Sequence, residues 1–305
     1  MATGTALLLA SVAATVIAAP LGLGLAGAVS ARRADAASSA GGSWRFAAAS
    51  MLVYVFAFNL TFFIQELFLV LPKALTPGLR PTLYHNNHAW EGSSPLASLF
   101  QGTGALATLS VGLLCLCLLR RPRPWSTGIR LFVFWMAYCG CFMALPQVVI
   151  GALSPGSDVG MAMTYLQLGE GARIGAALVA LGLMPLIAMR LCRPALELAD
   201  TPARVAGPAA RMRLVLRMVT LPALAGTALI IPFRVPRELV EVLLVPLLVM
   251  LCGIPWIQAG AWRVREVRPG GGAAAPSLAY PLAAVVGLLL FFQLVLRPGI
   301  PFYGS

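Results

Sequence analysis

The chain has 305 residues, of which 59% are hydrophobic and only 10% are charged. A soluble domain of this length would carry about a quarter charged residues, so the composition excludes an ordinary soluble protein. The net charge of +12 lies on arginines between apolar stretches, without a basic face interleaved with aromatics. We therefore expect the lipid bilayer, and no nucleic acid, as a partner.

Apolar runs of about 20 residues recur along the chain, the length that a helix needs to cross a bilayer. They predict an all-α fold, a polytopic integral membrane helix bundle of about eight transmembrane helices. The predicted spans are 4–29, 47–71, 97–119, 129–153, 172–191, 216–232, 239–261 and 278–297. The first has no positive residues ahead of its apolar stretch, which favours a retained span over a signal peptide.

The basic residues are distributed unevenly between the two sides that these spans define. Sixteen of the 22 fall in or next to four alternate loops, which are 30–46, 120–130, 190–217 and 262–277. The positive-inside rule places these loops in the cytoplasm and both termini outside, an N-out and C-out topology. The abundance of Ala, Gly and Arg suggests a GC-rich bacterial genome, so we expect a multi-pass protein of the bacterial cytoplasmic (inner) membrane.

One longer cytoplasmic segment, 192–215, contains three prolines and several arginines. It is interpreted as a linker between two membrane units. Residues 1–191 would form a five-helix unit that carries an outer loop with histidine and glutamate, and residues 216–305 a three-helix unit.

Glu66 lies in the second span, six residues before Pro72 and so about 9 Å below the outer end of the helix. Asn59 is seven residues earlier, nearly two turns, and shares its face. A carboxylate at that depth is costly without a partner and marks a candidate functional site. The alternative is structural: Glu66 is neutral, or pairs with Arg173 or Lys73, and holds helices together.

The outer loop after this span, "LYHNNHAWEG", holds both histidines of the chain, His85 and His88. Prolines at 77 and 81 stiffen the segment before it, so we expect a lid or re-entrant loop over the bundle. Two imidazoles with Glu66 would give three ligands and an open fourth position, the pattern of catalytic zinc. In the alternative, the histidines bond backbone groups and the neighbouring aromatics anchor the interface.

Asp158 follows the fourth span, in "LSPGSDVG". We expect Ser157 or Asp158 to cap a short interfacial helix. Asp158 is also a candidate further ligand, so the predicted metal ligands are His85, His88, Glu66 and Asp158, for zinc or another divalent ion. Glu66 is the candidate catalytic residue, as general base toward a metal-bound water.

A glutamate-bearing helix near one membrane face, a histidine element and a later Asp together resemble polytopic intramembrane metalloproteases of the site-2 type. The family's HExxH falls on residues 65–69, where only Glu66 matches, since Gln65 and Leu69 occupy the histidine positions. Asp158 would stand for the family's later Asp. The resemblance, over residues 55–192, implies a diverged membrane metallohydrolase or peptidase.

Three functions follow from this sequence. The first is a membrane metallohydrolase acting on a membrane-embedded or periplasmic substrate. The second is a transporter or permease-like protein, in which Asn59, Gln65 and Glu66 line a polar pathway gated by the histidine loop. The third is a non-catalytic scaffold whose rigid outer loop binds a membrane-protein or periplasmic partner.

Overall fold

The computed structural model describes residues 2–33, 44–121, 125–267 and 277–303 of the chain. Within them lie eight helical spans long and apolar enough to cross a membrane, which confirms the predicted number. The spans are Gly4–Arg32, Trp44–Ala74, Leu96–Leu119, Thr127–Leu153, Glu170–Leu196, Pro208–Arg234, Leu239–Arg263 and Ala279–Leu296.

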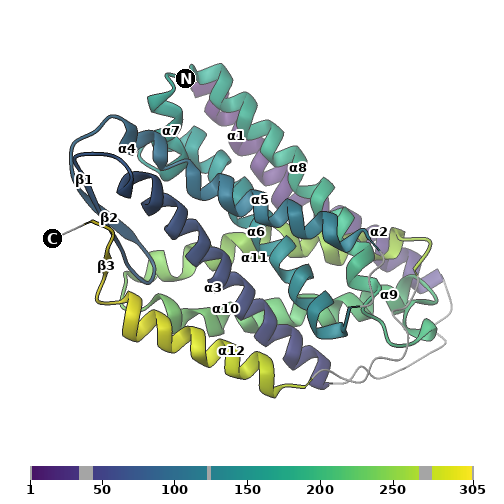
Figure 1. Ribbon diagram of the computed structural model, residues 1–305. Coiled ribbons are helices and arrows are strands. Elements are labelled where there is room, and N and C mark those ends of the chain that lie inside the picture. The colour runs from purple at the N-terminus through teal and green to yellow at the C-terminus, as the bar shows by residue number, and fades with distance from the viewer. Residues whose placement is uncertain (1, 34–43, 122–124, 268–276, 304–305) are drawn as a thin grey trace.

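Several spans are built from more than one helical piece (Figure 1). The first five contain α1 (Ala2–Ala13), η1 (Ala14–Ala18), α2 (Ala19–Arg33), α3 (Trp44–Ala74), α4 (Leu96–Phe100), α5 (Thr103–Leu119), α6 (Thr127–Leu153) and α8 (Glu170–Leu196), with the short α7 (Asp158–Tyr165) before α8. The last three contain α9 (Pro208–Val215), η3 (Leu216–Thr220), α10 (Leu221–Arg234), α11 (Leu239–Gly260), η4 (Ala261–Arg263), α12 (Ala279–Leu290) and η5 (Phe291–Leu296).

The innermost helix is α6, which packs against α3, α5, α8 and α11. Glycines let it approach α5 closely: a Cβ on Gly140 would lie 2.6 Å from the Cα of Gly112. Such small-residue contacts are the usual means by which membrane helices pack. Trp135 and Tyr138 of α6 also pack with tilted rings against Tyr54 of α3, and all three side chains are fully buried.

The segment 192–215 is more regular than a linker. Its first residues continue α8 to Leu196, and the rest contains η2 (Pro202–Val205) and α9. Helices from both predicted units pack together, since α3 contacts α10 and α12 while α11 contacts α6 and α8. The division into a five-helix and a three-helix unit stays a prediction.

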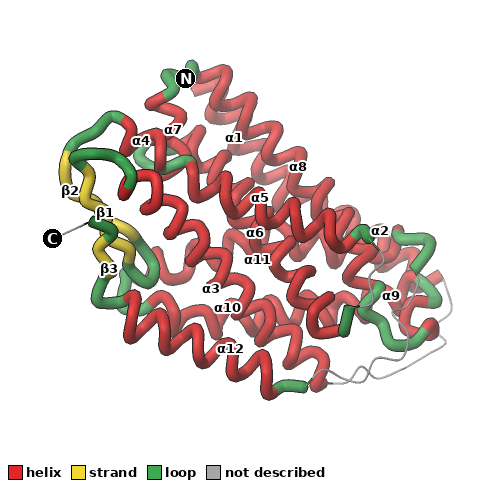
Figure 2. Tube along the Cα trace, viewed as in Figure 1, coloured by secondary structure: helices red, strands yellow, loops and turns green. Residues whose placement is uncertain are grey.

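Three short strands at one end of the bundle were not part of the all-α expectation (Figure 2). The segment expected to form a lid or re-entrant loop contains β1 (Leu79–Leu83) and β2 (His88–Gly92), which pair antiparallel as a hairpin. A third strand, β3 (Ile300–Pro301), pairs with the other edge of β1. The local sequence gave no strand signal, because β1 contains a proline and one of its partners comes from the far end of the chain.

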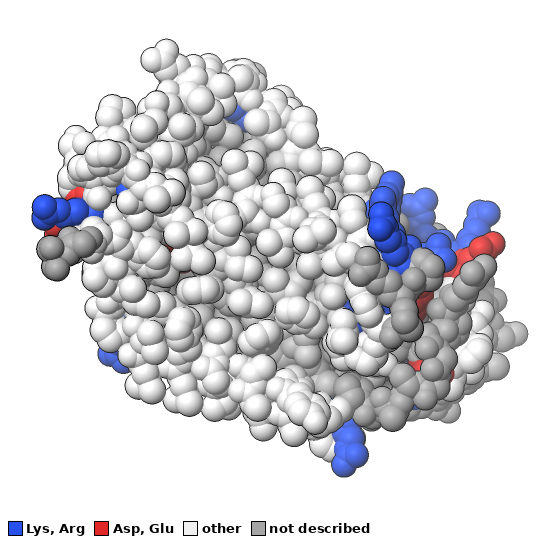
Figure 3. Space-filling model, in the orientation of Figure 1, with Lys and Arg blue, Asp and Glu red and all other residues white. Residues whose placement is uncertain are grey.

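Charged side chains gather at the two ends of the molecule and leave an uncharged band between them (Figure 3). The spans carry many exposed apolar side chains, among them Leu25, Val179 and Leu294. This surface fits a lipid bilayer, which has no water to solvate charges at that depth. The strands lie at the end where Glu66, Lys73 and His88 are buried.

Candidate functional site

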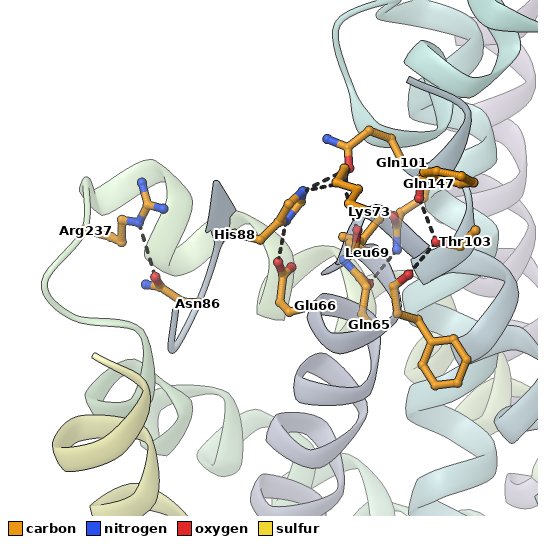
Figure 4. Close-up of polar contacts among 12 residues, drawn as sticks. Gln65, Glu66, Leu69, Lys73, Asn86, His88, Gln101, Thr103, Gln147 and Arg237 are labelled. Carbon is orange, nitrogen blue, oxygen red and sulfur yellow. Dashed lines mark hydrogen bonds and ion pairs between the residues drawn. The ribbon is translucent and has the colours of Figure 1, made fainter. Parts of the chain in front are cut away.

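A cluster of four buried polar side chains lies where the hairpin covers the end of α3 (Figure 4). Glu66 and Lys73 come from α3, seven residues apart, and so lie on one face of the helix. His88 is the first residue of β2, and Gln101 lies between α4 and α5. The hairpin therefore positions the imidazole of His88 between the side chains of Glu66 and Lys73.

The four groups form a continuous hydrogen-bonded chain. His88 Nδ1 lies 2.9 Å from Glu66 Oε2, and His88 Nε2 lies 3.2 Å from Lys73 Nζ and 2.9 Å from Gln101 Oε1. Lys73 also donates to the Leu69 carbonyl at 2.9 Å and to Gln101 Oε1 at 2.8 Å. The three N–H donors of a lysine ammonium thus meet three acceptors.

The contact between Lys73 and His88 joins two nitrogens that both bind protons. One hydrogen bond holds only one proton, so the pair is either an ammonium donating to a neutral imidazole or a neutral amine accepting from an imidazolium. Glu66 at the opposite ring nitrogen fixes the orientation of His88. The arrangement can therefore move a proton between the lysine and the histidine.

Water has little access to this cluster. The exposed fractions are 0% for Lys73, 5% for Glu66 and 8% for His88. Trp90 covers the outer side: its ring stacks on His88 with centroids 5.7 Å apart, and Lys73 Nζ lies 4.6 Å from its centre. Electrostatic interactions between the groups are stronger here than in water, because the local dielectric constant is low.

Asp158 extends the cluster toward α7. Ser157 caps this helix by accepting a hydrogen bond from the Gly160 amide, which confirms the expected short helix and its cap. Burial and the nearby charge of Glu66 raise the pKa of the Asp158 carboxyl to about 6, against the opposite effect of His88 and Lys73. Asp158 can therefore gain or lose a proton near neutral pH.

A cavity of about 190 Å³ is lined in part by Asp158 and by Gln65, the neighbour of Glu66 in α3. It is mostly apolar, with polar groups from Gln65, Gln147 and Asp158, and the amide of Gln147 donates to Gln65 Oε1 at 2.8 Å. Its other lining residues are Phe62, Phe142, Met143, Pro146, Ile150, Ser157, Val159, Val245, Leu248 and Val249. An apolar cavity with a few polar groups at one side suits an amphipathic ligand.

His85 lies in a different setting from His88, although only three residues separate them. It sits in the turn between β1 and β2, 6% exposed, near the charges of Arg234, Arg237 and Arg297. Burial lowers the pKa of His85 against the opposite effect of the Val235 backbone, and the positive charges of these arginines lower it further.

Of the four predicted metal ligands, the structure brings together Glu66 and His88, with Asp158 close enough to influence both. His85 is held among arginines, whose charges would repel a divalent cation. Within the described ranges, no group of three or more His, Cys, Asp or Glu side chains is arranged to hold a metal ion. The zinc site stays a prediction without support from this geometry.

The sequence singled out Glu66 and His88 but gave Lys73 and Gln101 smaller parts. Lys73 was only an alternative partner for Glu66, and Gln101 had no assigned role. One signal pointed to Lys73: it is the single lysine of the chain, two helical turns after Glu66. Arg173, the other expected partner of Glu66, instead donates to the Leu168 carbonyl and to Thr164.

Comparisons with known proteins found no relative of this chain. No family model, curated protein or solved structure matches this chain.

Proposed function

We propose that this chain is a multi-pass enzyme of the bacterial inner membrane, with the hairpin end facing outside. Its catalytic centre would be Lys73, His88 and Glu66. The observation that carries this proposal is the chain of contacts from carboxylate to imidazole to amine, buried under Trp90. A nucleophile bonded to a base, which a third group orients, is the general signature of an activated nucleophile.

In the proposed reaction, the Lys73 ammonium gives a proton to His88 Nε2, and Glu66 stabilises the imidazolium that forms. The neutral amine then attacks the carbonyl carbon of an amphipathic substrate whose apolar part occupies the neighbouring cavity. A C–N bond forms, and loss of water gives an imine. Gln101 holds the lysine in place through its side-chain oxygen.

The one-sided distribution of buried charge favours an enzyme over a carrier. The described acidic, basic and histidine side chains that are buried are Glu66, Lys73, His85, His88 and Arg234. All five belong to the hairpin end or lie directly beneath it, whereas the buried polar groups in the rest of the bundle are uncharged, such as Ser50 and Thr108. A carrier would need polar groups through both halves of the membrane.

The single lysine makes the test unambiguous. Purified protein in detergent is incubated with n-decanal and cyanoborohydride, which reduces an imine to a stable secondary amine, and peptide mass mapping separates Lys73 from the terminal amine. Alkylation of Lys73 should be about 100-fold slower in His88→Gln and Glu66→Gln, because the base is lost or misoriented.

His85→Gln is the matched control, because it changes the other histidine of the same hairpin. Lys73 of this variant should be alkylated at the wild-type rate. Equal rates in His88→Gln and His85→Gln, or no reaction of Lys73 in the wild type, would contradict the proposed nucleophile.

A metal-dependent hydrolase remains the second candidate, because Glu66 and His88 are in contact and Asp158 is close. In this version Glu66, His85, His88 and Asp158 bind zinc or another divalent ion, and both histidines are required. Metal analysis by mass spectrometry should then find about one ion per chain in the wild type and none in His85→Gln. If metal-free protein is still alkylated at Lys73, the result would favour the lysine nucleophile over the metal-dependent hydrolase.

A further inference from the structure

The His85 side of the hairpin contains buried polar atoms that no contact satisfies. His85 and Arg234 are 6% and 5% exposed. Both ring nitrogens of His85, and Nε and Nη1 of Arg234, are buried without a hydrogen-bond partner among the described residues. Such atoms in a native structure call for a ligand or water to bond them.

Arg234 is held firmly in this position. It is the last residue of α10, its Nη2 donates to the Glu241 carbonyl at 3.2 Å, and its guanidinium stacks 4.5 Å from the ring centre of Phe62. Asn86, next to His85 in the turn, donates to the Arg234 carbonyl and accepts from Arg237 Nε at 3.2 Å. The turn and the helix end are therefore fixed against each other.

The C-terminal segment adds another positive charge to the same place. Arg297 follows η5, and two residues later Gly299 turns the chain with a φ of +92°. β3 then pairs with β1 at Leu83, beside the turn that holds His85. Arg297, Arg234 and Arg237 are all close enough to influence His85.

Three arginines act on His85, and two carboxylates, Glu66 and Glu241, act on Arg234. Glu241 pairs with Arg237 at 3.2 Å, and Glu66 is engaged by His88 at 2.9 Å. Neither carboxylate is in ion-pair contact with Arg234 within the described part of the chain. Glu66 and Glu241 act on the Arg234 guanidinium from a distance but leave its buried Nε and Nη1 without hydrogen bonds, so the surroundings are suited to an added acceptor such as an anion.

We propose that His85 and Arg234, with Arg237 and Arg297 at the rim, bind a phosphate group, either on a lipid headgroup or as a free anion. A phosphate oxygen accepts charge-assisted hydrogen bonds from guanidinium, and its several oxygens can meet donors from different elements. The imidazole of His85 supplies a further N–H donor. The proposed topology puts this site at the outer membrane surface, the level of lipid phosphates.

The test uses full-length protein in detergent and has two arms. In the first, inorganic phosphate is titrated at constant ionic strength, and binding is followed by the rise in thermal unfolding temperature. In the second, native mass spectrometry measures retention of phosphatidylglycerol against phosphatidylcholine. Wild type is compared with Arg234→Gln and His85→Gln, the latter in case the buried arginine is needed for folding.

Arg80→Gln is the matched control, because it removes an exposed arginine opposite Glu91 on the same hairpin. We expect Arg234→Gln to bind about 10- to 100-fold more weakly than wild type, and His85→Gln to bind more weakly than the control. Binding in the phosphate arm alone assigns a free anion, and binding in the lipid arm alone assigns a headgroup. No binding in either arm, or equal binding by His85→Gln and Arg80→Gln, would overturn the proposal.

This inference is independent of the proposed enzyme, because it uses none of the groups in the lysine chain. His85→Gln should weaken phosphate binding yet leave alkylation of Lys73 unchanged, and His88→Gln should do the reverse. The two proposals can therefore fail separately.

Discussion

The two histidines of the hairpin lie three residues apart and have different charged neighbours. His88, on β2, is in contact with a carboxylate and a lysine, whereas His85, in the turn, is surrounded by three arginines. The difference arises because strand pairing directs His88 down onto α3, while the turn extends over the ends of α10 and η5. Figure 4 shows the Asn86–Arg237 contact well apart from the His88 cluster. A short His-x-x-His spacing therefore does not establish a shared site.

The largest effect should come from removing the lysine on the His88 side. Lys73→Met deletes three hydrogen bonds and removes a buried positive charge that acts on Glu66. The free energy of unfolding should fall by about 3–5 kcal/mol. Denaturant or thermal unfolding in detergent measures it, with the exposed Arg80→Met as control. A double variant with Glu66→Gln should recover part of the loss, and a Lys73→Met loss no larger than that of the control would contradict the buried network.

A smaller loss of stability is expected from glycine substitutions in the hairpin, and it tests whether the fold of the hairpin keeps His85 and His88 in separate surroundings. Gly92 and Gly78 both have positive φ, 92° and 84°, but only at Gly92 would a Cβ collide with backbone, namely the carbonyl of Gly78. Gly78→Ala should cost about 1 kcal/mol from its φ alone. Gly92→Ala should cost more, and should also disturb the signals of His88. Equal losses in the two variants would mean that the hairpin does not close as described.

The smallest expected effect is a pH dependence of the unfolding free energy, which arises from Asp158 at the edge of the cluster. The pKa of Asp158 is raised from 3.8 to about 6, so the folded protein binds its proton more tightly than the unfolded chain does. This contribution favours folding at low pH and is lost as the pH rises from about 4 to about 6. Asp158→Asn removes it, so unfolding measured across this range should show a flatter pH profile. Identical profiles would contradict the burial of Asp158.

Hydropathy was sufficient to predict the membrane spans, because each is defined by local composition. The fourth was predicted at 129–153 and lies at Thr127–Leu153, and the third at 97–119 lies at Leu96–Leu119. The depth of Glu66 likewise predicted a buried polar site. The N-out and C-out orientation stays a prediction, because it rests on the distribution of arginines among the loops.

The partners of Glu66 could not be predicted from spacing. They depend on the register that pairs Leu83 with His88, and on the break between α4 and α5 that positions Gln101. The setting of His85 depends on β3, at the opposite end of the chain. Contacts of this kind come from tertiary structure, and no local pattern in the sequence encodes them.

The most direct test of the account is nitrogen NMR of protein labelled with ¹⁵N-histidine, since the chain has only two histidines. We predict that Lys73→Met shifts the Nε2 signal of His88 and Glu66→Gln its Nδ1 signal, because each variant removes the hydrogen-bond partner of that nitrogen. The signals of His85 should change little in either variant and should respond to Arg234→Gln instead. Unchanged His88 signals in both Lys73→Met and Glu66→Gln would contradict the carboxylate–imidazole–amine chain.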